Sequence, residues 1–205
     1  MAKANEVIVP ESGQGALGPA LLAVGQAHID YRSHPLFARR MERFLSVLFD
    51  KQIAFRFPQL WQTKGETLLQ FASQCVEDIS ALSQTRSCWQ QNRQVSVDHK
   101  RRQCGICAAC LLRRMSLHAA SLTDPPETYV WEDLTAERFE TGVAATFPTR
   151  KVTRALRDHA IAGVLHLDHL AGLRHAPMHK PTLQHAAFKL SRACNSSEKE
   201  VQERL

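Results

Sequence analysis

The segment CGICAACLLRR, residues 104–114, places three cysteines at intervals of three positions and continues directly into two arginines. This spacing is typical of metal-binding proteins, because the thiolates of Cys104, Cys107 and Cys110 can converge on one ion. The N-terminal residues lack the long apolar stretch of a signal peptide, so we expect the chain to stay in the cytoplasm. Cytoplasmic thiols are kept reduced, and we therefore interpret these cysteines as metal ligands rather than as disulfide partners.

A structural zinc ion requires four ligands in a tetrahedron, and the sequence offers two candidates for the fourth. Cys88 is the simplest choice, because zinc tolerates a long loop between two groups of ligands. His99 is the competing candidate, and an iron–sulfur cluster is the alternative to zinc. Cys75, at an apolar position of an expected helix, and Cys194, in the polar C-terminal part, are not expected to take part.

Two local features favour a metal knuckle around these cysteines. Gly105 follows the first cysteine of the cluster and permits the backbone turn that brings amide hydrogens to the sulfur atoms. Cys110 opens the segment LLRRMSLHAASL, which we expect to form a helix whose first turn holds the last ligand.

Positive charge is concentrated in the same region. The chain of 205 residues has a formal net charge of +6, and residues 86–114 hold seven basic residues against one acidic residue, which accounts for the whole excess. Such a surface can bind nucleic acid, nucleotide phosphates or an acidic protein. Alternatively, it offsets the charge of the thiolates and is simply solvated.

Residues 13–18 match the GxGxxG pattern of dinucleotide-binding folds, but their context argues against such a site. Pro10 precedes the pattern, Pro19 follows it, and no second strand ends in an acidic residue about 20 positions further on. We therefore expect residues 11–32 to form a loop.

The remaining pattern predicts a mixture of strands and helices. Short strands are expected over residues 5–10 and 52–58. A helix should begin at His34, as its N-cap or as a packing group, and reach about Phe49. Its expected buried face consists of Phe37, Met41, Phe44, Leu45 and Leu48.

A second helix is expected over residues 63–82, because Thr63 and Glu66 form a capping box. Its expected buried stripe consists of Leu68, Leu69, Ala72, Cys75, Val76, Ile79 and Leu82. From about residue 149 the chain should be all-helical before a polar tail, with one stripe formed by Val152, Leu156, His159, Gly163 and Leu167. Trp89 and Trp131 are expected in the core.

Several motifs recur here in the order known from one enzyme family. These motifs are Glu11-Ser12-Gly13 after a strand, Tyr31-Arg32-Ser33-His34-Pro35, Thr63-Lys64-Gly65-Glu66, Ser87-Cys88, and the cysteine cluster with its trailing Arg113. Over roughly residues 5–132 the chain resembles the C-terminal half of the 7-cyano-7-deazaguanine synthase (QueC-like) family. It is most similar to the divergent branch found in bacterial antiphage-defence operons of the Qat type.

This resemblance implies an α/β fold of the adenine-nucleotide α-hydrolase (PP-loop) type, in which helices cover both faces of a parallel sheet. Residues 1–132 would form the C-terminal half of that domain, with a zinc knuckle over 88–114, and residues 133–205 a helical extension with a polar tail. The family binds a structural zinc with four cysteines, which correspond here to Cys88, Cys104, Cys107 and Cys110. Its members adenylate a 7-deazapurine carboxylate with ATP, and ammonia then converts the product through an amide to a nitrile.

One motif of the family is missing from this sequence. The Ser-Gly-Gly-x-Asp-Ser loop that binds ATP does not occur, and Ser12-Gly13-Gln14-Gly15 does not replace it. We therefore expect the chain to be inactive alone, with ATP as a cofactor only if an N-terminal half is supplied. A truncated gene or fragment is the most economical explanation, and the alternatives are a separate polypeptide that carries the ATP-binding half or loss of the nucleotide chemistry. The expected partners are that half or neighbouring operon proteins, with a homodimer as an alternative.

Candidate substrate-binding residues are few, and no catalytic residue can be assigned. Arg32 offers a planar guanidinium for a carboxylate or phosphate, and Lys64 stands at a helix N-terminus that favours anions. The alternative function is a non-enzymatic zinc-knuckle module that binds nucleic acid or a protein through residues 86–114. A membrane span is not expected, because the sequence has no run of 18 apolar residues.

Overall fold

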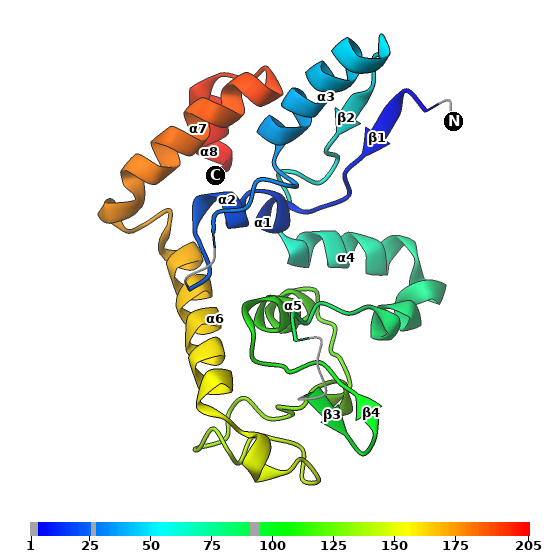
Figure 1. The fold of residues 1–205 in the computed structure, drawn as a ribbon, viewed down its shortest axis with the longest axis vertical. Coiled ribbons are helices and arrows are strands. Elements are labelled where there is room, and N and C mark those ends of the chain that lie inside the picture. Colours follow the sequence, from blue (N-terminus) through cyan, green and yellow to red (C-terminus); the bar gives the residue numbers. More distant parts are fainter. Residues whose placement is uncertain (1–3, 26–27, 91–94) are drawn as a thin grey trace. The chain divides into compact units, whose positions relative to one another are not determined.

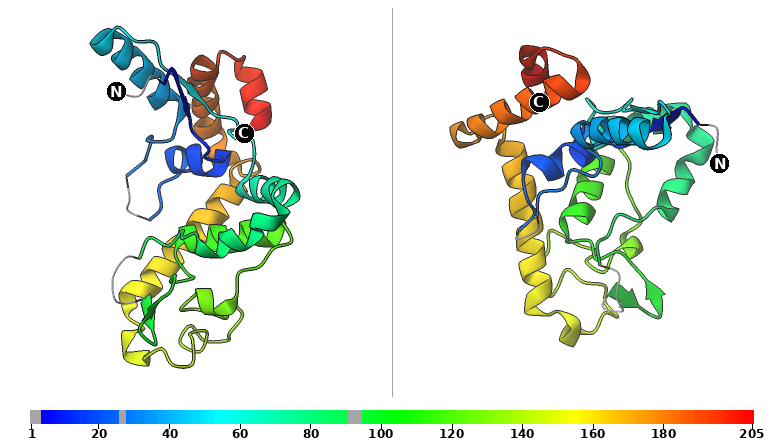
Figure 2. Two further views of the ribbon diagram at one scale, coloured as in Figure 1. Left: turned by 90° about the vertical axis from the view of Figure 1, so that its right-hand side faces the viewer. Right: turned by 45° about the horizontal axis from the view of Figure 1, so that its top comes forward.

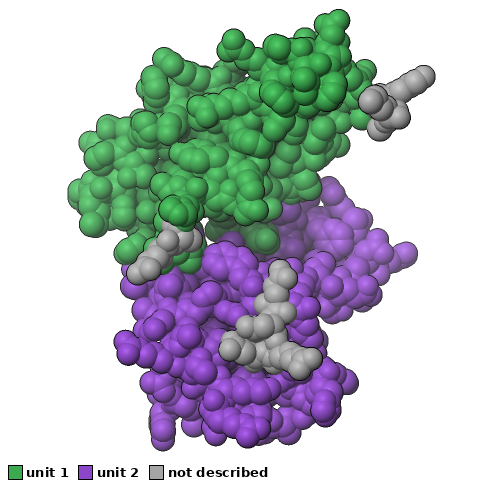
Figure 3. All heavy atoms as spheres, in the orientation of Figure 1, with its two compact units in different colours: residues 1–64, 169–205 green, residues 65–168 purple. Residues whose placement is uncertain are grey.

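The structure is a computed structural model that describes residues 4–25, 28–90 and 95–205 (Figure 1). Its contacts divide the chain into two compact units, coloured separately in Figure 3. Unit 1 comprises Met1–Lys64 and His169–Leu205, and unit 2 comprises Gly65–Asp168. Each unit has a buried core of its own. The division of the chain at residue 132 into a family domain and an extension stays a prediction.

Unit 1 is built on a small parallel sheet. Strand β1 (Glu6–Ile8) pairs with β2 (Ala54–Arg56), with Glu6 opposite Ala54 and Ile8 opposite Arg56. Helix α3 (Pro35–Phe49) lies between the two strands in the sequence, as a parallel pair requires. The two predicted strands are therefore confirmed in position, although each is shorter than expected.

The glycine-rich segment after β1 is helical, so the expectation of a loop over residues 11–32 was partly wrong. It forms two single-turn helices, α1 (Gly13–Ala16) and α2 (Gly18–Leu21). A Cβ atom on Gly13 would lie 2.3 Å from the carbonyl oxygen of Leu60, so only glycine permits this backbone approach. The first glycine of the GxGxxG pattern is thus explained by packing.

Helix α3 begins as predicted, with His34 as its N-cap. The Nδ1 atom of His34 accepts a hydrogen bond from the Leu36 amide at 3.1 Å, and Pro35 occupies the first turn. Burial of the His34 ring, together with the charge of Lys189, lowers the pKa of this histidine to about 4. The imidazole is therefore neutral and free to accept this hydrogen bond at neutral pH.

The predicted buried face of α3 is largely exposed. Phe37, Phe44 and Leu48 are 40%, 56% and 57% exposed, whereas the buried residues of this helix are Pro35 and Ala38. The helix packs on β2 and on α7 (Lys180–Cys194) through a different face from the one its apolar pattern indicates.

The C-terminal residues of unit 1 are helical, including the segment predicted to be a polar tail. Helices α7 and α8 (Glu198–Arg204) pack against each other, as both views in Figure 2 show. A capping box joins Ser197 and Glu200 at the start of α8, and Val201 is fully buried. The core of unit 1 consists of Ala16, Leu17, Leu60, Ala187, Leu190 and Val201.

Unit 2 contains little regular structure apart from helices. Helix α4 (Lys64–Gln74) is shorter than predicted and is followed by the 3-10 segment η1 (Val76–Gln84). The expected apolar stripe of this helix is partly exposed, at Leu69 and Val76. The other elements are β3 (Ser96–Val97), β4 (Lys100–Arg101), α5 (Ala108–Ala119), η3 (Pro126–Thr128), η4 (Thr149–Lys151) and α6 (Arg154–Gly172). The last residues of α6 belong to unit 1, and the short segment η5 (Pro177–His179) follows there.

The core of unit 2 surrounds the cysteine cluster. Trp131 and Leu156 are each 2% exposed, which confirms the core position predicted for this tryptophan. Trp89 is 50% exposed, so its predicted core position was wrong; its indole ring meets the ring of His159 edge-on. Within the described ranges, every helix is too short or too polar to cross a membrane.

Candidate metal centre

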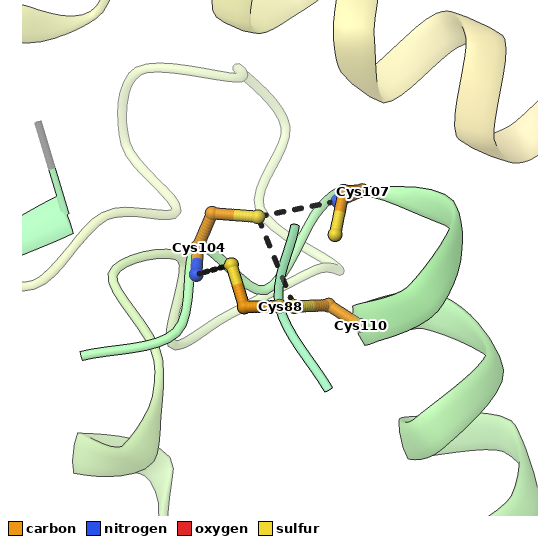
Figure 4. A group of neighbouring side chains, drawn as sticks. All are labelled: Cys88, Cys104, Cys107 and Cys110. Carbon is orange, nitrogen blue, oxygen red and sulfur yellow. Dashed lines mark hydrogen bonds between the residues drawn. The ribbon is translucent and has the colours of Figure 1, made fainter. Parts of the chain in front are cut away.

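The structure brings together the four cysteines that the family resemblance implied as metal ligands. The sulfur atoms of Cys88, Cys104, Cys107 and Cys110 all lie within 4.8 Å of one another, and all four residues are buried. Figure 4 shows the four side chains pointing toward a common centre. Unit 2 therefore contains a site that can hold a metal ion such as zinc.

Each cysteine is held by a different local structure. Cys88 follows η1, Cys104 follows the β3–β4 hairpin, Cys107 is the N-cap of α5, and Cys110 lies in the first turn of that helix. Gly105 adopts a positive φ of 87°, and a Cβ atom there would lie 2.9 Å from the carbonyl oxygen of Trp131. The predicted turn at Gly105 and the predicted place of Cys110 in a helical first turn are both confirmed.

Backbone amides point at two of the sulfur atoms. The Cys88 sulfur accepts a hydrogen bond from the Gln90 amide at 3.3 Å. It accepts another from the Cys104 amide at 3.2 Å, and the Cys104 sulfur accepts one from the Cys107 amide at 3.4 Å (Figure 4). Amide hydrogens directed at sulfur favour the thiolate form, which is the form that binds metal ions.

The thiols are too close together to ionise independently. A hydrogen bond from Cys104 lowers the pKa of the Cys88 thiol to about 7, and the neighbouring thiols also lower the pKa of Cys107. Hydrogen bonds to Cys104 and Cys107 raise the pKa of Cys110, because a second negative charge beside an existing thiolate is unfavourable. A divalent cation at the centre removes this conflict and allows all four cysteines to be thiolates.

The distances suit a single tetrahedral ion. Four sulfur atoms about 2.3 Å from a zinc ion lie about 3.8 Å from one another. The Cys104 and Cys110 sulfur atoms are 3.8 Å apart. An iron–sulfur cluster must hold several iron and sulfide atoms between its ligands, which separates the cysteine sulfurs further than a single ion does. The spacing therefore favours one ion over a cluster.

His99, the competing fourth ligand, does not belong to the site. It lies exposed at the turn of the β3–β4 hairpin, with a φ of 61°, and Asp98 beside it has a φ of 49°. Consecutive left-handed residues are characteristic of a tight hairpin turn. Cys75 and Cys194 also lie outside the cluster, as predicted, and both are half-buried.

Arg113 of helix α5 forms a buried ion pair and also connects this helix to the segment before Cys88. The Arg113 Nε atom lies 2.6 Å from an Asp124 carboxylate oxygen, and their side chains are 7% and 5% exposed. Arg113 also donates hydrogen bonds to the Thr85 hydroxyl at 2.6 Å and to the Leu82 carbonyl at 2.8 Å. Tyr129 donates a further hydrogen bond to Asp124.

This network positions the ligands relative to one another. Thr85 lies three residues before Cys88, and Arg113 lies three residues after Cys110, so the contact between them fixes two ligand-bearing segments. The sequence singled out Arg113 as part of a motif, but the contribution of Asp124 was missed because Asp124-Pro125-Pro126 indicated only the end of a helix.

Most arginines of the basic segment 86–114 contact the protein itself. Arg114 stacks on the Tyr129 ring, with its guanidinium carbon 3.8 Å from the ring centroid, and Arg102 forms an ion pair with Glu132 at 2.6 Å. Arg86 donates to the Arg102 carbonyl oxygen at 2.9 Å.

The positive surface is therefore smaller than the sequence suggested. Lys100 and Arg101 are exposed on β4, whereas Arg93 lies outside the described residues. Binding of nucleic acid through this segment stays a prediction.

The first part of helix α6 packs directly on the knuckle. A Cβ atom on Gly163 would lie 2.8 Å from the Ala108 amide nitrogen and 3.1 Å from the Ile106 carbonyl oxygen. Leu156, about two helical turns earlier, is buried in the same core. The apolar stripe predicted for this helix is confirmed at these two positions.

The two candidate substrate-binding residues lie in unit 1. Arg32 is exposed and pairs with Asp30 at 2.6 Å, which raises the pKa of the Arg32 guanidinium. Lys64 is the first residue of α4, and its amide donates to the Gln14 side-chain oxygen at 2.8 Å. Their roles in substrate binding stay predictions.

Comparison with known families decides the assignment. Residues 16–121, just over half of the chain, match the family model described as queuosine biosynthesis protein QueC. The chain belongs to the QueC family. The match includes the four clustered cysteines, so the metal site lies within the part of this QueC chain that defines its family. Searches of curated proteins and of solved structures each found no match.

Proposed function

We propose that this QueC chain is the zinc-binding portion of an ATP-dependent enzyme that converts a 7-deazapurine carboxylate into the corresponding nitrile. Another polypeptide supplies the ATP-binding half, and the pair belongs to the Qat-type antiphage-defence branch of the family. The observation that carries this proposal is the buried four-cysteine cluster inside the QueC match. The 205 residues contain no Ser-Gly-Gly-x-Asp-Ser sequence, so the proposed reaction needs this loop from outside them.

The chemistry needs a good leaving group at a carboxylate carbon. A carboxylate oxygen attacks the α-phosphorus of ATP and expels pyrophosphate, which leaves an acyl adenylate. Ammonia then attacks the carbonyl carbon and expels AMP, which yields an amide, and activation of the amide oxygen with a second ATP leads to the nitrile. Catalysis of this type rests on alignment of the reactants and on cations and amides that stabilise negative charge on the phosphates.

The described residues contribute structure and positive charge to this reaction. A zinc ion held by the four cysteines fixes the knuckle, and the hydrogen bonds from Arg113 to Thr85 and Leu82 fix the two segments that carry Cys88 and Cys110. Lys64 at the N-terminus of the 11-residue helix α4 adds a cation to a helix end that already attracts anions. Arg32 would bind a substrate carboxylate by exchanging its present partner, Asp30.

The test is AMP formation from ATP, ammonia and a 7-deazaguanine carboxylate. The isolated chain should form no AMP, and a QueC ATP-binding half with the Ser-Gly-Gly-x-Asp-Ser loop should form none by itself. The mixture should form AMP and the nitrile, detected by mass spectrometry. Replacement of Arg32 by alanine should reduce turnover of the mixture, with the neighbouring Ser33→Ala substitution as the matched control. AMP formation by this chain alone would contradict the proposal.

A further inference from the structure

The parallel sheet of unit 1 has two outer edges, and the hydrogen bonds between its strands show which backbone groups face each edge. The Ala54 amide donates to the Asn5 carbonyl at 2.9 Å, and the Val9 amide donates to the Arg56 carbonyl at 2.8 Å. Alternate residues of a strand bond to the same neighbour. The backbone groups of Phe55 therefore face the outer edge of β2, and those of Glu6 and Ile8 face the outer edge of β1.

The outer edge of β2 is closed by helix α3. The Phe55 amide donates to a Glu42 carboxylate oxygen at 2.7 Å, and the other oxygen of Glu42 pairs with Arg39 at 2.9 Å. Arg39 in turn donates to the Ala193 carbonyl of α7 at 2.8 Å. Helix α3 contacts both β2 and α7, and it lies beside β2 in Figure 1. The outward amide of Phe55 is therefore already bonded to α3.

The outer edge of β1 is open. All three residues of β1 are exposed, and the apolar side chains of Val7 and Ile8 are 38% and 63% exposed. Within the described part of the chain, no strand pairs with this edge. Glu6 pairs with Arg56 at 2.8 Å, so its charge is neutralised. In many proteins an unpaired charge on an edge strand prevents another strand from pairing with it, and the paired Glu6 does not have this effect.

We propose that the outer edge of β1 is the docking edge for a parallel strand of the separate ATP-binding half. This inference rests on the proposed function and adds the surface on which the two polypeptides meet. Parallel sheets occur with both faces covered and with several strands, and a two-stranded sheet with exposed valine and isoleucine is incomplete by that standard. Glu6 is the charged residue of β1 and is paired with Arg56, so the three residues of this strand suit an uncharged, apolar neighbour of the kind found inside parallel sheets.

A second copy of the chain fits this edge less well. A two-fold axis would pair the two β1 strands antiparallel, and three residues against three bury far less than the roughly 1,200 Å² of a stable interface. It would also bring the Glu6 carboxylates of both copies to the same face of the sheet. In contrast, an ATP-binding half that adds strands to the sheet and covers its faces would bury the side chains of Val7 and Ile8 as well as the edge.

Docking at β1 also places the expected ATP loop where it is needed. Strands of a parallel sheet end at the same edge, and ligands bind outside their carboxyl ends. The carboxyl end of β1 leads into Ser12 and α1, where Gln14 accepts the hydrogen bond from the Lys64 amide. A phosphate-binding loop that follows a partner strand beside β1 therefore lies at the end of the sheet that already carries Lys64.

The experiment measures binding of this full chain to a QueC ATP-binding half by analytical ultracentrifugation. The variant Ile8→Pro removes an amide that faces only the outer edge, whereas Ile8→Ala keeps the amide and removes the side chain. Wild type and Ile8→Ala should bind, and Ile8→Pro should lose affinity about tenfold or more. Ile8→Lys places a charge on the edge and should weaken binding in the same way, with thermal melting of each variant alone as the control for folding.

Each outcome has one meaning. Binding of Ile8→Pro within about twofold of Ile8→Ala would overturn the docking edge, since 1.4 kcal/mol corresponds to tenfold. Self-association that Ile8→Pro abolishes would assign the edge to a second copy and would also overturn the proposal. If the mixture forms AMP while Ile8→Pro and Ile8→Lys still bind fully, the proposed function is supported and the docking edge is overturned. If the wild-type chain neither binds the ATP-binding half nor forms AMP with it, the docking edge and the proposed function are both overturned.

Discussion

The two units of this QueC chain differ in where their large apolar side chains lie. In unit 2, Trp131, Leu156 and the four clustered cysteines are buried around one site. In unit 1, the most regular apolar face belongs to α3, yet Phe37, Phe44 and Leu48 on that face are exposed. Unit 2 closes around a site that can hold a metal ion, whereas unit 1 leaves the apolar face of α3 exposed.

The energetic meaning of this difference follows from transfer free energies. Burying a phenylalanine or leucine side chain contributes about 1.5–3 kcal/mol. Unit 2 gains this contribution at positions such as Trp131 and Leu156, whereas the exposed face of α3 does not yet provide it. The stability of unit 2 should therefore depend on individual buried residues and on its metal, and that of unit 1 on few of its large apolar residues.

The largest expected effect tests whether unit 2 depends on a metal. Purified protein should contain about one zinc ion per chain, and Cys107→Ser should lose the metal and unfold the knuckle, because structural zinc in small domains contributes about 10–16 kcal/mol. Metal analysis and the fluorescence of the buried Trp131 would measure both effects. Cys75→Ser is the matched control, since Cys75 lies outside the cluster. Stoichiometric iron, or unchanged melting of Cys107→Ser, would contradict a structural zinc site.

An intermediate effect is expected in unit 1, at the buried N-cap of α3. The pKa of His34 is lowered to about 4 in the folded chain, from about 6.5 in an unfolded one. Protonation of His34 therefore favours the unfolded state. The full contribution of neutral His34 to the free energy of unfolding is present above pH 6.5 and is lost between pH 6.5 and 4, by about 1.4 kcal/mol per pH unit and about 3 kcal/mol in total. Hydrogen exchange of the α3 amides would follow this change.

The control for this prediction is His34→Asn, which keeps an acceptor at the N-cap and does not titrate. The exchange protection of the α3 amides in wild type, measured relative to that in His34→Asn, should decrease steadily as the pH falls from 6.5 to 4. A difference that is independent of pH in this window would show that His34 is accessible to protons in the folded chain.

The metal site was predictable because its signals are local. The spacing of Cys104, Cys107 and Cys110 requires a turn and a helical start, and Gly105 supplies the one residue that tolerates a positive φ of 87°. Spacing favoured Cys88 but left His99 open as the fourth ligand, and the family resemblance implied Cys88 as well. The structure explains that choice, because His99 is needed at a left-handed position of a hairpin turn.

Other expectations failed because they depended on distant partners. The apolar pattern of α3 gives the position of an apolar face but not what covers it, and no described residue buries Phe44. The end of α4 at Gln74 has no proline or glycine to mark it, so the predicted helix ran too far. The helix α8 was missed although Ser197 and Glu200 form a capping box, because its composition is polar and its one buried anchor is Val201.

The smallest expected effect is the most direct test of the comparison between the units. Phe44→Ala in the isolated chain should change the free energy of unfolding by less than about 1 kcal/mol, because a side chain that is 56% exposed loses little burial and alanine favours the helix. Leu156→Ala, at a residue that is 2% exposed, should cost about 2–5 kcal/mol. Urea titrations of both variants would measure the two values. Equal losses would mean that α3 is covered in solution, and the contrast between the units would then fail.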